Sequence, residues 1–145
     1  MSLPKPEAGL VIRYSYLWMS EFEESQEDGG KIRPCAIVVA VSQTGKSEEV
    51  VVLPVTHAIP AEPEYAMEIP AVTKRRLGLD EGRSWVVFSE SNAFTWPGPD
   101  LRRIGNVGNE SVAYGKLPPN FANELIRRFK ELEAAGQSKR VPRTE

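Results

Sequence analysis

The sequence has one cysteine and one histidine among its 145 residues. A single cysteine cannot form an internal disulfide, and Cys35 lies just inside an apolar run, which favours a small buried side chain over a nucleophile. The chain also lacks Cys/His metal spacing, a Gly-rich phosphate loop and the nucleophile elbow of hydrolases. These absences exclude most common enzyme classes, and we expect neither a metal nor a cofactor.

Long apolar runs are missing as well. No stretch approaches the ~20 residues that cross a bilayer, and the N-terminus lacks the apolar core of a signal peptide. We therefore expect a cytoplasmic protein without membrane contact. The formal net charge of −2 disfavours a nucleic-acid binder. However, the segment Glu21–Asp28 is acidic without a base, and outside it and the tail after Gly136 the chain is nearly neutral, which leaves room for a local basic surface.

The length suits one domain. We expect a flexible leader over residues 1–8, a single domain over residues 9–136, and a flexible basic tail over residues 137–145. The tail carries Lys139, Arg140 and Arg143.

Two apolar, β-branched runs, Cys35–Val41 and Val50–Thr56, are typical of adjacent central strands. If they pair as a hairpin through the turn Ser42–Glu49, antiparallel pairing brings Arg33 beside Thr56. The first run is apolar at every position, so both of its faces must be covered. Pro54 has no N–H to donate, which predicts a bulge or an unpaired edge at that point.

The remaining patterns predict short strands, one short helix and one long C-terminal helix. We expect the long helix from Phe121 to Leu132, with Asn120 as N-cap and Gly136 as stop, and Gly78 as the end of the short helix. A long polar loop, Met19–Lys31, follows the first strand. The predicted fold is mainly β, a small, strongly bent antiparallel sheet or barrel. The other predicted elements are strands at 10–18, 65–69 and 84–88 and the short helix at 71–77.

Arg33 and Thr56 are the most suggestive polar pair. Arginine offers a planar fork of donors suited to phosphate, and a threonine hydroxyl can donate to a second oxygen of the same group. Together they would cradle a phosphodiester. His57 follows Thr56 directly and faces the opposite side if the strand is regular.

The order of these motifs resembles the MazF/PemK family of toxin endoribonucleases. The resemblance rests on Gln26-Glu27-Asp28-Gly29-Gly30-Lys31-Ile32-Arg33-Pro34 before an apolar strand, and on Leu53-Pro54-Val55-Thr56 after it. It extends from Gly9 to Leu132. The resemblance implies a small SH3-like β-barrel with a C-terminal helix, a homodimer, metal-independent cleavage of single-stranded RNA, and neutralisation by a cognate antitoxin protein.

The family's chemistry, in which an RNA 2′-hydroxyl attacks its own phosphate, implies roles for individual residues. Arg33 would supply positive charge, Thr56 would position the phosphate, and Glu27 or His57 would carry protons. Asp28 replaces Glu27 if Lys31 is not counted as an insertion. The residues expected to contact RNA are Lys31, Asp28, Lys74, Arg75, Arg76, Asn92 and Thr95.

Other interpretations stay open. The barrel can be catalytically inactive and bind an extended peptide in its groove, or bind RNA or DNA without cleaving it. Arg33 can instead pair with the acidic loop, and the cluster Lys74–Arg76 can be a solvated helix face. Trp85, Phe88 and Trp96 are expected in the core or in a dimer contact. The apolar strands also suggested burial by a second subunit.

Overall fold

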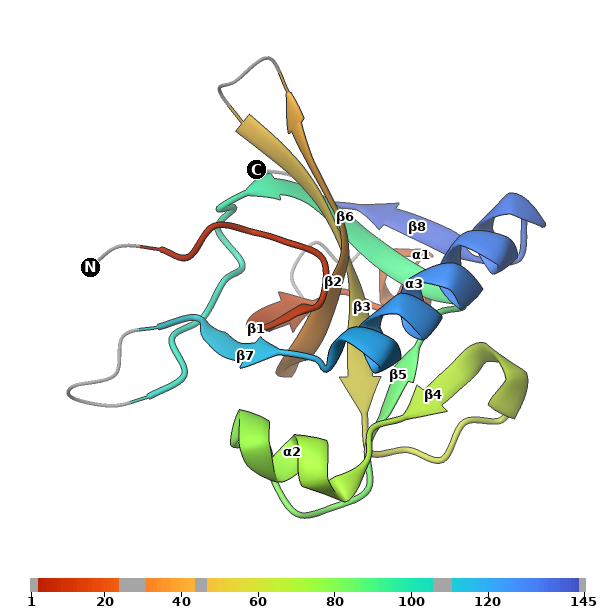
Figure 1. The fold of residues 1–145 in the computed structure, drawn as a ribbon. Coiled ribbons are helices and arrows are strands. Elements are labelled where there is room, and N and C mark those ends of the chain that lie inside the picture. The colour runs from red at the N-terminus through yellow and green to blue at the C-terminus, as the bar shows by residue number, and fades with distance from the viewer. Residues whose placement is uncertain (1–2, 24–30, 44–46, 106–110, 144–145) are drawn as a thin grey trace.

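The computed structural model describes residues 3–23, 31–43, 47–105 and 111–143. Within them the protein is mainly β, as predicted, with eight strands in a curled, largely antiparallel sheet (Figure 1). The strands are β1 (Leu10–Tyr16), β2 (Lys31–Gln43), β3 (Ser47–Thr56), β4 (Ala66–Glu68), β5 (Trp85–Val87), β6 (Glu90–Trp96), β7 (Ala113–Lys116) and β8 (Lys139–Pro142). The helices are α1 (Met19–Glu23), the single 3-10 turn η1 (Pro63–Tyr65), α2 (Ala71–Leu77) and α3 (Pro119–Ala134).

The antiparallel hairpin of β2 and β3 is the centre of the sheet, which confirms the predicted pairing. Cys35 lies opposite Pro54, and continuing that register by two residues brings Arg33 opposite Thr56. Ala36 packs in the core cluster that includes α3, whereas Ile37 packs in the cluster on the other face with β1 and β6. Both faces of β2 are therefore covered within one chain over residues 35–38, whereas Ile32 and Val41 on the same strand are 40% and 50% exposed.

Pro54 sits where β3 changes partner. The strand pairs with β6 through Val52 and with β5 from Val55 onward. The proline thus falls between the two partner strands, where its missing N–H costs no ladder hydrogen bond. This switch lets the end of β3 diverge from β6 and carry Thr56 toward α2.

The helices end almost where the sequence predicts. Gly78 caps α2 in the left-handed region, with φ of 75°. Helix α3 lies across one face of the sheet in Figure 1 and buries Leu125 and Phe129. The expected N-cap of α3 is wrong: the helix begins at Pro119 with Pro118 as N-cap, so Asn120 lies inside its first turn. Proline at the first helical position is favoured because its missing N–H has no intrahelical partner there.

The residues expected to form a flexible basic tail instead extend the sheet. Residues 139–142 form β8, which pairs in parallel with β6 and buries Val141 completely. The Arg143 guanidinium is 3% exposed and lies 3.0 Å from the Asp100 carboxylate. The prediction of a flexible tail is wrong because it was based on the many charges of this segment. The position of the segment depends instead on the burial of Val141 and on the acceptors that bind Arg143.

In the described part of the chain, no helix has the length and apolar character needed to span a membrane.

Candidate functional site

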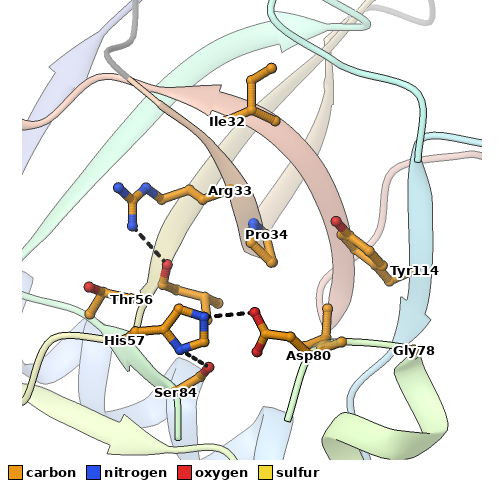
Figure 2. Close-up of a pocket in the computed structure, with 11 residues that line it drawn as sticks. Ile32, Arg33, Pro34, Thr56, His57, Gly78, Asp80, Ser84 and Tyr114 are labelled. Atoms are coloured by element: carbon orange, nitrogen blue, oxygen red, sulfur yellow. Dashed lines mark hydrogen bonds and ion pairs between the residues drawn. The ribbon is translucent and has the colours of Figure 1, made fainter. Parts of the chain in front are cut away.

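A cavity of about 380 Å³ lies at the end of β3, in the size range of small-ligand sites. It brings together the three described residues to which the sequence analysis assigned catalytic roles: Arg33 from the start of β2, and Thr56 and His57 from the end of β3 (Figure 2). Its other lining residues are Ile32, Pro34, Val55, Gly78, Leu79, Asp80, Ser84 and Tyr114. We call this cavity the hairpin pocket.

The Arg33 side chain makes two contacts, and one of its nitrogens has no hydrogen-bond partner among the described residues. Its Nη1 donates to the carbonyl of Val55 at 3.1 Å, and the guanidinium stacks over the Trp18 ring at 5.0 Å from the ring centroid. Its Nε is buried and has no hydrogen-bond partner among the described residues. A buried donor without an acceptor is rare in folded proteins and is unfavourable.

Thr56 ends β3 and lies on the wall between two cavities. It lines the hairpin pocket and also a neighbouring cavity that contains Trp18 and Tyr65. Its hydroxyl accepts a hydrogen bond from the Ala58 N–H at 3.1 Å, which fixes the side chain and leaves the hydroxyl proton available. In the close-up, the Thr56 hydroxyl and the Arg33 guanidinium lie on the same side (Figure 2).

His57 is clamped between two oxygen acceptors. Its Nε2 lies 2.8 Å from the Asp80 carboxylate, and its Nδ1 lies 2.7 Å from the Arg83 carbonyl. Neither acceptor can donate a proton, so the ring satisfies both contacts only when both nitrogens carry one. The side chain is 54% exposed and the ring turns toward Asp80 in Figure 2. His57 was expected to face the opposite side of the strand from Thr56, and both residues nevertheless line one pocket.

Lys74 anchors the other side of this contact. Its ammonium donates to the second oxygen of Asp80 at 2.9 Å, to Ser84 Oγ at 2.6 Å and to the Gly82 carbonyl. The hydrogen bond from Lys74, followed by that from His57, holds the pKa of Asp80 below its ordinary value. Asp80 is therefore ionised at neutral pH.

Three residues in contact, Ser84, His57 and Asp80, are of the types found in a nucleophilic triad. Their hydrogen bonds differ from those of a triad. Ser84 Oγ lies 3.2 Å from Nδ1 of His57, yet that nitrogen is closer to the Arg83 carbonyl and must carry a proton. It cannot accept the hydroxyl proton of Ser84. Ser84 is also 2% exposed and accepts a hydrogen bond from Lys74. The geometry thus disfavours Ser84 as a nucleophile.

Three of the residues expected to contact RNA have other partners. Lys74 is 4% exposed, so its ammonium serves the turn 80–84 rather than the surface. Asn92 is fully buried and bonds both the N–H and the carbonyl of Leu17. Thr95 donates to Glu49 at 2.7 Å, near the start of β3 and away from the hairpin pocket. The RNA-contact expectation does not fit these placements.

The remaining expected residues divide into two groups. Arg75 and Arg76 are exposed on α2, which also provides the buried Lys74. Glu27 and Asp28 lie outside the described residues, and for Lys31 only the backbone, at the start of β2, is described.

The sequence analysis did not identify Asp80, Ser84, Tyr114 or Trp18 as site residues. Asp80 lies two residues after Gly78, which was predicted to end the short helix. A carboxylate in the turn after a predicted helix was the signal in the sequence that could have identified it. Tyr114 comes from β7, and burial raises the pKa of its hydroxyl, so it is neutral. No local pattern relates it to β3.

Comparison with models of protein families gave no match for this chain, and comparison with curated proteins gave none either. The resemblance to the MazF/PemK toxins therefore rests on the sequence motifs.

Proposed function

We propose that this protein is a metal-independent endoribonuclease that cleaves single-stranded RNA in the hairpin pocket, as the MazF/PemK resemblance implies. The observation that carries the proposal is that three residues line one cavity of about 380 Å³: Arg33, Thr56 and His57. Arg33 comes from β2, whereas Thr56 and His57 are neighbours at the end of β3. The presence of an arginine, Arg33, in the lining of this cavity supports an anionic ligand there, because a guanidinium is suited to bind phosphate.

The reaction forms a bond between the 2′-oxygen and phosphorus and breaks the bond to the 5′-oxygen. The products are a 2′,3′-cyclic phosphate and a 5′-hydroxyl. Arg33 stabilises the added negative charge on the phosphoryl oxygens, and Thr56 donates to one of them. His57 gives a proton to the departing 5′-oxygen. The base that takes the 2′-hydroxyl proton is assigned by the resemblance to Glu27 or Asp28, which lie outside the described residues.

The wider biology also follows from the resemblance. By this resemblance, the protein is the toxin of a type II toxin-antitoxin system. It acts in the cytoplasm as a homodimer and is inhibited by its cognate antitoxin. We expect the exposed Arg75 and Arg76 on α2, whose Gly78 cap lines the hairpin pocket, to contact the RNA backbone beyond the scissile phosphate.

The test is incubation of purified protein with RNA of mixed sequence in EDTA. We expect discrete fragments ending in a cyclic phosphate, and a 10²- to 10³-fold slower reaction for Arg33→Ala, the usual loss for a charge-stabilising donor. Arg127→Ala is the matched control, because Arg127 is a half-exposed arginine on α3 paired with Glu124 and Glu131. Intact RNA in the presence of well-folded wild-type protein would contradict the proposal. Tight binding of uncleaved RNA or of a peptide would then support a binding module.

A further inference from the structure

Asp80 has a geometry that the proposed reaction does not by itself require. One carboxylate oxygen is fixed by the buried Lys74 ammonium at 2.9 Å, and the other faces Nε2 of His57 at 2.8 Å. The opposite nitrogen of the ring is fixed by the backbone carbonyl of Arg83. The imidazole is therefore held at both nitrogens, and its Nε2 proton lies at the Asp80 side of the hairpin pocket.

The other charged and titratable groups near His57 come from four elements. Arg33 from β2 and Tyr114 from β7 line the same pocket, and Lys74 from α2 reaches the ring through Asp80 and Ser84. Arg83 contributes its carbonyl, while its guanidinium pairs with Glu68 at 2.8 Å. Within the described residues around the ring, Asp80 is thus the carboxylate in direct contact.

We propose that Asp80 is a positioning residue that keeps the proton on Nε2 of His57, so that His57 is the proton donor to the departing oxygen. The proposal rests on the proposed function, and it adds to it the group that holds the proton of the acid His57. An RNA oxygen that enters the pocket displaces one oxygen of Asp80 from Nε2, while the other stays on Lys74. The proton then passes from Nε2 to the 5′-oxygen, and the ring is left neutral and facing the carboxylate.

The first experiment uses the single histidine of the chain, whose ring carbon and proton signals are unambiguous in NMR. The full-length protein and Asp80→Asn are titrated from pH 4.5 to 9. In the variant we expect the midpoint of the ring titration to move to lower pH, because the carboxylate that contacts Nε2 is replaced by a neutral amide. Glu124→Gln, which removes an ion pair on α3, is the matched control and should leave the titration unchanged. Equal midpoints for wild type and Asp80→Asn would overturn the proposal.

The second experiment measures RNA cleavage against pH. We expect the decline at high pH to begin at lower pH in Asp80→Asn, with a rate within about threefold of wild type on the acid side, and Asp80→Glu to restore the wild-type profile. A uniform loss at every pH would mean a merely structural role and would overturn the proposal. If wild-type protein leaves RNA intact, the proposed function fails, while the NMR titration still decides whether Asp80 holds the proton on His57.

Discussion

Among the carboxylates that pair with cations in the described structure, Asp80 and Asp100 differ clearly in exposure. Asp80 beside the hairpin pocket is 64% exposed and contacts Lys74 and the half-exposed His57. Asp100 is 12% exposed and contacts Arg143, which is 3% exposed. Arg143 also donates to the Ser15 carbonyl at 2.7 Å and to Asn92 Oδ1 at 3.1 Å.

The difference teaches how to separate a structural ion pair from one that can serve chemistry. We call the Arg143–Asp100 pair the sealed pair, because its side chains are 3% and 12% exposed beside the parallel contact of β6 and β8. The Asp80 pair is the open pair, because Asp80 lines a cavity that Arg33 and Thr56 also line. Substitutions at the sealed pair should therefore change stability, and substitutions at the open pair should change the reaction.

The largest expected effect is at the sealed pair. Arg143→Met leaves the buried Asp100 carboxylate without its cation, and breaking a buried pair in this way costs about 3–5 kcal/mol. Urea unfolding measures the change. Cleavage per folded molecule should stay at the wild-type level. A loss below about 1 kcal/mol would mean that the C-terminal strand contributes little to the fold.

Lys74→Met tests the buried end of the open network. The change leaves Ser84 Oγ, in a residue that is 2% exposed, without its donor, and such an unsatisfied buried group costs about 1–3 kcal/mol. We expect a loss of about this size in urea unfolding, together with slower RNA cleavage because Asp80 loses its anchor. Arg75→Met, the adjacent exposed base on α2, should leave stability within about 0.5 kcal/mol. A stable Lys74 variant would contradict the anchoring role.

A smaller effect on the reaction is expected at Thr56. Thr56→Val keeps the shape of the side chain and removes one hydrogen bond to the anionic phosphate, worth about 1.5–3 kcal/mol, which corresponds to about a 10- to 150-fold slower cleavage. Thr56→Ser retains the hydroxyl and should stay close to wild type. Single-turnover cleavage rates distinguish the two, and equal rates for the valine and serine variants would remove Thr56 from the reaction.

The smallest effect concerns the pH dependence of stability. Because the pKa of Asp80 is lowered in the folded protein, its contribution is present above the ordinary aspartate value and is lost as pH falls through the lowered value. Wild type should exceed Asp80→Asn by about 0.2–1 kcal/mol at pH 6, since the Asp80 side chain is 64% exposed. The difference should shrink below about pH 4. Urea unfolding at pH 6 and pH 3 measures it, and a difference that grows on acidification would contradict the assignment.

The sequence predicts the hairpin and the convergence of Arg33 and Thr56 because both depend on local signals. Strand periodicity and antiparallel pairing fix their register without knowledge of the rest of the fold. Asp80 was not predicted because its contact with His57 depends on how α2 docks against the end of β3. The burial of Asn92 and the order of the residues after Gly136 were also missed, since a polar composition does not reveal acceptors supplied by distant strands.

The most direct test of the account is a single-turnover comparison of one RNA with wild type, Arg33→Ala and Arg143→Met, each corrected for its folded fraction. The account predicts a 10²- to 10³-fold loss for Arg33→Ala and no loss per folded molecule for Arg143→Met. Equal cleavage by wild type and a folded Arg33→Ala would place the reaction outside the hairpin pocket and contradict the central claim.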